Sequence, residues 1–154
     1  MTDFIYGTRP GAVPLLTTEL NALASAGVSA FGPVITPGTT TNLTVRHLRG
    51  DLLFKMASSS LALTATSFVA VYFVPAIDGT NYPKLSGSNL ARANYRVGTI
   101  ALYPATLSAE VIYEGVLSVR IPNVVFKTVL ENLSGVALPA SGNTLDLYPQ
   151  AINY

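Results

Sequence analysis

The stretch FVAVYFV, residues 68–74, decides the fold of this 154-residue chain. Its residues are apolar on both alternating faces, whereas a strand that is wet on one side alternates apolar with polar residues. Its β-branched and aromatic side chains favour a strand over a buried helix. Pro75 removes a ladder donor at the end of the stretch, and DGTN at residues 78–81 supplies turn residues. The sequence therefore predicts a core strand that runs out into an exposed loop.

Further strands are predicted on either side of the core strand, separated by Gly, Pro, Asn and Ser. They span residues 42–47, 51–56, 95–103, 111–121, 124–133 and 144–148, and residues 61–67 lead into the core strand. Gly50 indicates a turn or bulge, and Pro149 is expected to end the last strand. Strict alternation along 95–103 puts Tyr95 and Val97 on one face. About eight strands without a long helix predict an all-β fold, an antiparallel β-sandwich that is jelly-roll-like.

The first 38 residues differ from the rest and are predicted to form an extended N-terminal arm on a β-sandwich domain at residues 39–154. The arm holds four of the ten prolines and five of the twelve glycines, and it lacks a sustained apolar period. Within it, residues 17–24 are typical of a short helical turn that ends at Gly27. So long an irregular segment is unusual in a compact domain, and we expect it to lie on its own or a neighbouring subunit. Apolar side chains argue against the alternative, a disordered tail.

The amino-acid composition favours a protein that assembles with other subunits. Hydrophobic residues make up 49% of the chain and charged residues 11%, against about 25% in an ordinary soluble domain. A charge-poor surface suits contact with other subunits. The net charge of +1 is too small to steer the chain to nucleic acid or to a membrane surface. No disulfide or cysteine-ligated metal exists, since there is no cysteine.

No targeting or membrane segment is expected. The chain has no run of about 18–20 apolar residues, and its N-terminus lacks the pattern of a signal peptide. Residues 42–44 and 132–134 match the glycosylation acceptor pattern. Without a secretion signal, both matches are interpreted as chance.

No catalytic, cofactor or metal site is predicted, so an enzyme is the least favoured class. His47 is the only histidine, and Asp51 follows four residues later, but the serines at 58–60 lie in no nucleophile elbow. Glu110 and Glu114 are about 13 Å apart along a strand, too far for a glycosidase pair. The acidic residues are scattered singly, and Asp78 is expected in an ordinary turn rather than a calcium loop. Five arginines suit salt bridges across a subunit interface better than nucleic-acid binding: Arg46, Arg49, Arg92, Arg96 and Arg120.

Three stretches resemble a family of small virion proteins of tailed bacteriophages. They are TTELNAL at residues 17–23, VYFVPAIDGTNYP at 71–83 and FKTVLENLSGVALPASGNTL at 126–145. The resemblance covers most of the chain in family order, except for residues 40–60. Its motifs are scaffold residues and mark no active site.

The resemblance implies a structural virion protein, for which a capsid decoration or cement protein on the capsid exterior is the leading hypothesis. The expected partners are the chain itself, as a homotrimer, and the major capsid protein, with no cofactor. Five arm residues are predicted to contact a subunit or the shell: Phe4, Ile5, Tyr6, Leu15 and Leu16. A neck, tail or fibre-attachment protein is one alternative. A carbohydrate-binding module is another, with Tyr82, Tyr95 and Tyr103 available for stacking on sugars.

Overall fold

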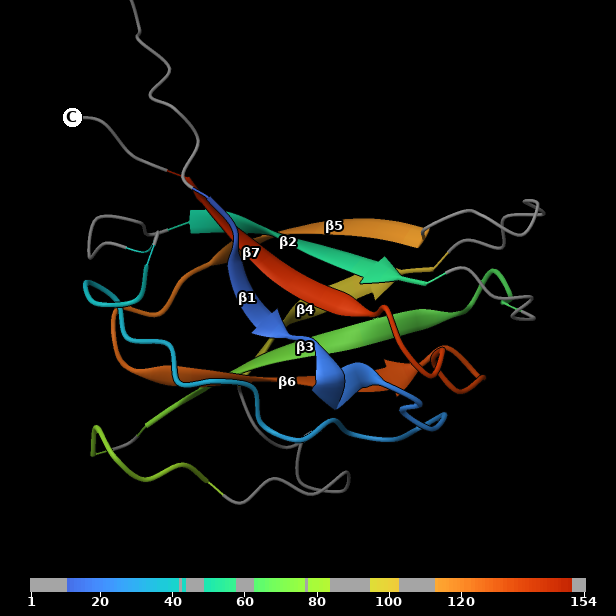
Figure 1. The fold of residues 1–154 in the computed structure, drawn as a ribbon, viewed down its shortest axis with the longest axis horizontal. Coiled ribbons are helices and arrows are strands. Elements are labelled where there is room, and N and C mark those ends of the chain that lie inside the picture. Colours follow the sequence, from blue (N-terminus) through green and yellow to red (C-terminus); the bar gives the residue numbers. More distant parts are fainter. Residues whose placement is uncertain are drawn as a thin grey trace, which may run out of the picture.

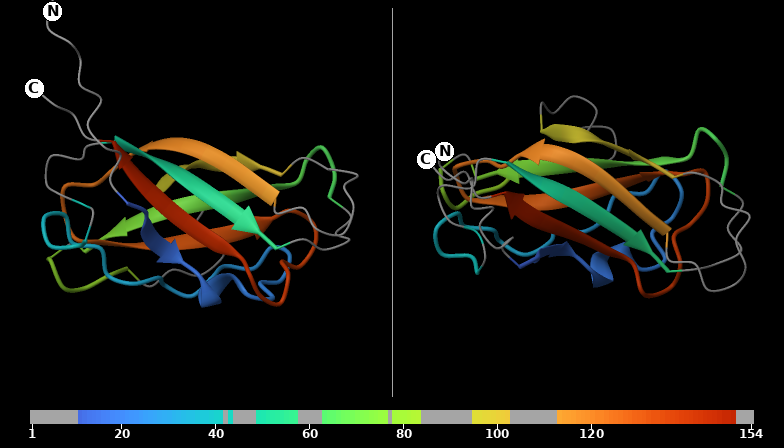
Figure 2. Two further views of the ribbon diagram at one scale, coloured as in Figure 1. Left: turned by 45° about the horizontal axis from the view of Figure 1, so that its top comes forward. Right: turned by 90° about the horizontal axis from the view of Figure 1, so that it is seen from above.

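The computed structural model describes residues 11–41, 43, 49–57, 63–76, 78–83, 95–102 and 113–150. In this part the strands form two antiparallel sheets (Figure 1). The four-stranded sheet runs, in spatial order, through β1 (Val13–Leu16), β7 (Thr144–Gln150), β2 (Arg49–Met56) and β5 (Tyr113–Arg120). The three-stranded sheet runs through β4 (Arg96–Ala101), β3 (Phe68–Pro75) and β6 (Phe126–Leu133). Figure 2 shows the sheets stacked as two layers, so the predicted all-β sandwich is confirmed.

The core strand predicted from FVAVYFV is β3, the middle strand of the three-stranded sheet. Every residue from Val69 to Val74 is buried. Val69, Val71 and Phe73 face the main core between the sheets, while Ala70, Tyr72 and Val74 belong to a second cluster on the outer side. The run is apolar on both faces because both faces of β3 are covered.

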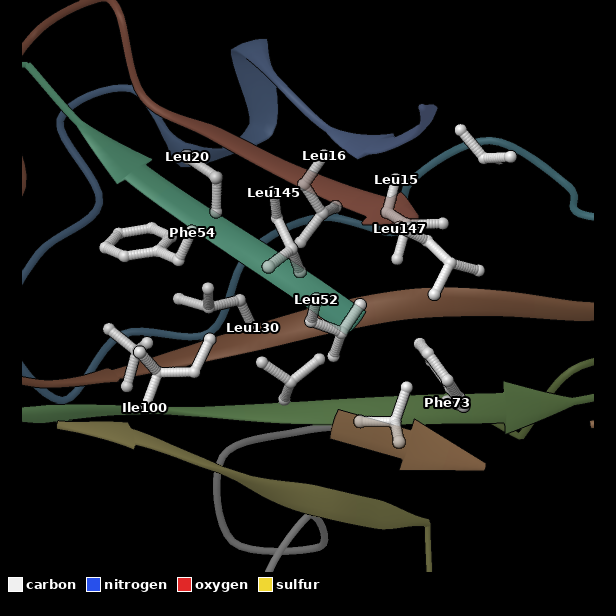
Figure 3. Packing of buried hydrophobic residues seen from close by; sticks show 14 of the residues in the cluster. Leu15, Leu16, Leu20, Leu52, Phe54, Phe73, Ile100, Leu130, Leu145 and Leu147 are labelled. Carbon is white, nitrogen blue, oxygen red and sulfur yellow. The ribbon is translucent and has the colours of Figure 1, made fainter. Parts of the chain in front are cut away.

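The main core fills the space between the two sheets (Figure 3). Leu52 and Leu147 reach into it from the four-stranded sheet, and Leu130 and Phe73 meet them from the three-stranded sheet. The rings of Phe73 and Phe126 pack at a centroid distance of 4.8 Å with a tilt of 44°. Burial of these side chains supplies the main driving force of folding, at about 25 cal/mol per Å² of apolar surface.

The described part of the arm, residues 11–38, lies on its own chain. Residues 13–16 form β1 and pair with β7, and residues 26–35 run beside β6. Four backbone amides, at Ala26, Ser29, Gly32 and Ile35, donate to carbonyls of β6 at 2.7–3.0 Å. This segment joins the edge of the three-stranded sheet through a hydrogen bond at every third residue, without regular strand geometry.

The helical turn is shorter than predicted. A 3-10 turn spans Thr18–Leu20, and the chain leaves it well before Gly27. The backbone amide of Thr17 donates to the Glu19 carboxylate at 2.8 Å, whereas the Thr17 side chain makes no capping bond. Ala22 has a φ of 54°, a left-handed conformation that no helix can continue through.

Three local predictions were wrong. Gly50 is a regular member of β2 and forms no turn or bulge. Glycine is suited to this position because a Cβ there would collide with Leu147 and the Tyr148 carbonyl. A register shift between β3 and β4 turns Val97 toward the main core, away from the face that Tyr95 occupies. Pro149 lies inside β7, opposite Gly50. The predicted strand at 42–47 lies outside the described residues, apart from Leu43.

Candidate interaction surface

The two outer faces of the sandwich differ sharply in exposure. On the three-stranded sheet, Ala70, Tyr72, Val74 and Val129 point away from the main core but are at most 2% exposed. Partly buried apolar side chains pack over them: Val28, Phe31, Tyr82, Tyr95 and Leu133. This outer face is therefore covered by the chain itself.

The outer face of the four-stranded sheet has no such cover in the described part of the chain. Along β2, β5 and β7, inward residues are mostly buried, and every described outward residue is half-buried or exposed. We call this surface the open face. Its described members are Pro14, Arg49, Asp51, Leu53, Lys55, Val116, Ser118, Arg120, Thr144, Asp146, Tyr148 and Gln150.

An apolar centre lies in the middle of the open face. Val116 on β5 is 66% exposed and lies directly opposite Leu53 on β2. Tyr148 on β7 is one diagonal step from Leu53, since it pairs with Asp51. Directly opposed and diagonal side chains on one face of an antiparallel sheet lie within contact range of each other. These three side chains therefore form a small apolar area on the sheet, in which Val116 is exposed and Leu53 and Tyr148 are half-buried.

Polar side chains frame this centre and are already hydrogen-bonded. Asp51 accepts hydrogen bonds from the Ser118 hydroxyl at 2.6 Å and from the Gln150 amide at 3.1 Å. The Thr144 hydroxyl donates to Asp146 at 3.2 Å. These bonds hold the carboxylates in place on the sheet, a rigid arrangement suited to recognition.

One end of the open face is positively charged. Arg49 of β2 lies directly opposite Arg120 of β5, and both are exposed. Beside Arg120 is a hollow of about 270 Å³, lined by Arg120, Ile121, Pro122 and Asn123. Of the five arginines predicted to suit salt bridges across a subunit interface, these two lie opposite each other. Arg96 lies on β4 of the other sheet, and Arg46 and Arg92 lie outside the described residues.

The covered face contains a polar pair. The Tyr72 hydroxyl donates to the Glu131 carboxylate at 2.7 Å. Burial, followed by this hydrogen bond and the negative charge of Glu131, raises the pKa of Tyr72 to about 12, although Arg96 opposes the shift. A neutral tyrosine at physiological pH is therefore a stable donor that ties β3 to β6.

Two of the three tyrosines proposed for sugar stacking, Tyr82 and Tyr95, pack against their own chain. The Tyr82 ring lies 6.0 Å from that of Phe31, and the ammonium of Lys127 lies 4.5 Å from the Tyr82 ring centroid. Tyr95 packs on the covered cluster, and Tyr103 lies outside the described residues. The arrangement of Tyr82 and Tyr95 favours a structural role over an open stacking platform.

Two of the five predicted contact residues can be placed. Leu15 and Leu16 are each 1% exposed and fill the core of their own chain, so neither offers surface to a neighbour in this structure. Phe4, Ile5 and Tyr6 lie outside the described residues. Val116 and Leu53 were not predicted from the sequence as contact residues. The signal for Val116 was present, because this valine stands on the otherwise polar side of an alternating strand.

The described side chains that were considered for catalysis or metal binding are scattered or already hydrogen-bonded within the chain. His47 and Glu110 lie outside the described residues, and Asp51 is held by Ser118 and Gln150. Asp78 accepts from the backbone of Asn81 and Thr80, and these bonds lower its pKa to about 2. Within the described ranges, no three His, Cys, Asp or Glu side chains gather as metal ligands. The same ranges contain no helix with the length and apolar character needed to span a bilayer.

Comparison with known proteins adds no relative to this description. No protein-family model matches the chain, and neither a curated protein nor a solved structure matches it.

Proposed function

We propose that this chain is a structural virion protein of a tailed bacteriophage, a capsid decoration or cement protein. It binds the major capsid protein on the exterior of the head and stabilises the shell as a homotrimer. The observation that carries the proposal is the difference between the two outer faces. One is covered by side chains of the chain itself, and the other has no such cover among the described residues and exposes Val116 at 66%. A face with an apolar centre framed by polar and charged side chains suits a protein contact.

The strand order supports the jelly-roll architecture that goes with this function. If the segment 26–35 is counted as a strand beside β6, each sheet has four members. Their chain order is then first, eighth, third and sixth in one sheet and fifth, fourth, seventh and second in the other. This order matches that of a jelly roll, an architecture that viral capsid proteins use.

Reinforcement of a shell needs binding energy and no chemistry. Each copy that buries its open face removes apolar surface from water, at about 25 cal/mol per Å². Many copies acting together resist separation of neighbouring shell subunits. The hydrogen-bonded frame around Asp51 keeps the face in shape before binding, which lowers the entropic cost of association.

The copy number of the chain in purified particles tests this proposal. Quantitative mass spectrometry against the major capsid protein gives a ratio near one for a cement protein that covers the head. A few copies per particle would instead support the neck, tail or fibre-attachment alternative. Absence from particles would refute the virion proposal, and sedimentation of the purified protein tests the trimer separately.

A further inference from the structure

The opposed arginines at the end of the open face are an unfavourable arrangement for an isolated protein. Arg49 and Arg120 are direct partners in the β2–β5 register, so both side chains project from the same face. Directly opposite residues have Cβ atoms roughly 4.5–5.5 Å apart, and like charges at that distance destabilise a sheet. The chain has only nine basic residues, and two of them are placed against each other.

No described residue neutralises this pair. Neither guanidinium has an ion-pair partner among the described residues. The nearest acid on the same face is Asp51, two residues further along β2, and both of its oxygens accept hydrogen bonds from Ser118 and Gln150. Within the described part of the chain, the positive charge at this end of the open face is therefore not offset by an ion pair.

The surroundings of Arg120 provide room for a ligand. The hollow of about 270 Å³ begins at Arg120 and continues along Ile121, Pro122 and Asn123, where the chain leaves β5. Asn123 is exposed, whereas Ile121 is 2% exposed and forms an apolar floor. An acidic side chain that reaches between the arginines would rest its methylene groups in this hollow.

The charge pattern selects a compact anion over a polyanion. Arginine presents a planar fork of donors that matches a carboxylate in a bidentate geometry. Beyond the arginines, Asp51 and Asp146 put negative charge on the same face, where they would repel a continuous phosphate backbone. The chain as a whole carries only +1. Local carboxylates on a protein surface fit this pattern.

We propose that Arg49 and Arg120 form a carboxylate-binding site that receives acidic side chains of a partner protein. The proposal rests on the proposed function only in taking that partner to be the shell. Val116 and Leu53 would supply the apolar contact with the partner. The arginines would fix the orientation of the open face relative to that partner.

The first experiment measures the affinity of three variants for particles that lack the protein: Arg49→Gln, Arg120→Gln and the double variant. Each single change is expected to weaken binding by about tenfold or more, the usual scale for loss of a close charge pair. The matched control is Arg96→Gln, an exposed arginine on β4 of the other sheet, and it should bind as the wild type does. If the double variant binds particles as tightly as the wild type, the site is wrong although the proposed function stands.

The second experiment needs no particle and therefore separates the two proposals. A short oligoglutamate peptide is titrated into isotope-labelled protein while the side-chain signals of Arg49 and Arg120 are followed by NMR. Both signals should shift in the wild type, and the double variant should show no binding. Absence of any shift at the two arginines would overturn the site. Tighter binding of an oligonucleotide of equal charge at the same residues would overturn its assignment to carboxylates.

Discussion

The side-chain amide of Asn132, on β6, donates a 3.0 Å hydrogen bond to the carbonyl of Leu23 in the N-terminal segment. The same nitrogen also donates to Ala24 at 3.2 Å and to Val136 at 2.7 Å, and its oxygen accepts from Ser134. Asn132 is completely buried. One side chain therefore joins the arm, β6 and the following turn. Its match to a glycosylation acceptor pattern has no structural support, because the amide that would carry a glycan lies inside the fold.

We expect Asn132→Ala to lower the free energy of unfolding by about 3 kcal/mol, because it removes the hydrogen bonds that this fully buried side chain makes to the arm and to the turn after β6. Chemical denaturation measures the change. Asn123→Ala, at an exposed position after β5, is the matched control and should stay within about 0.5 kcal/mol of the wild type. A small effect at both positions would show that the arm is held by other contacts.

Gly32, in the segment beside β6, packs closely against β1. A Cβ at this position would lie 2.1 Å from the Leu15 carbonyl oxygen and 2.9 Å from a methyl group of Leu16. Backbone cannot give way as a side chain does, so Gly32→Ala should cost about 3 kcal/mol, the upper end of overpacking effects. Thermal unfolding tests this value.

Gly79→Ala is the control for steric conflict at Gly32. Gly79 has a φ of 79° but no heavy atom within 4 Å of an added Cβ. Its substitution should cost only about 1–2 kcal/mol, from the left-handed backbone. Equal losses at the two glycines would contradict the close contact between the arm and β1.

Tyr72 should make stability depend on alkaline pH. Its pKa is about 12 in the folded chain, above the usual value of 10.0, so the folded state holds the phenolic proton more tightly than the unfolded state. This contribution is complete below about pH 10 and is lost as the pH rises through about 12. Urea denaturation at several pH values measures the loss, and Tyr72→Phe should flatten that part of the profile. An unchanged profile in Tyr72→Phe would assign the alkaline loss to other groups.

The sequence predicted the parts of the fold that local pattern determines. β3 could be identified because a short run that is apolar on both faces is typical of a strand covered on both sides. The strand predicted at residues 124–133 contains β6, which begins two residues later. The register shift at Val97 could not be predicted, because it depends on how β4 pairs with β3 across a long loop. Nothing in the local pattern indicated that Pro149 would be tolerated within a strand. Pro149 lies beyond residues 145–147, the part of β7 that pairs with β1, so its missing donor costs no hydrogen bond to β1.

The interaction surface was harder to predict than the fold. Leu15 and Leu16 were expected to reach a neighbour because they lie in an irregular, apolar arm, but the arm supplies strand β1 and buries them. A contact residue is one whose side chain stays exposed after the chain has folded. Alternation along β5 could mark Val116 as an apolar residue on a polar side of its strand. Its position opposite Leu53 depends on the spatial order of strands far apart in the sequence, so the apolar centre emerged only once β5 was placed beside β2.

The most direct test of the open face compares two valine-to-aspartate variants. Val116 is 66% exposed on the open face, and Val34 is 50% exposed in the segment beside β6 on the other layer. Both variants should fold, because neither valine contributes to the core.

The measurement is the affinity of Val116→Asp and Val34→Asp for purified particles that lack the protein, determined by co-sedimentation. We predict that Val116→Asp binds at least about tenfold more weakly than the wild type, since it places a charge in an apolar contact, while Val34→Asp binds normally. If Val116→Asp binds as tightly as the wild type, the open face is not the surface through which this protein assembles.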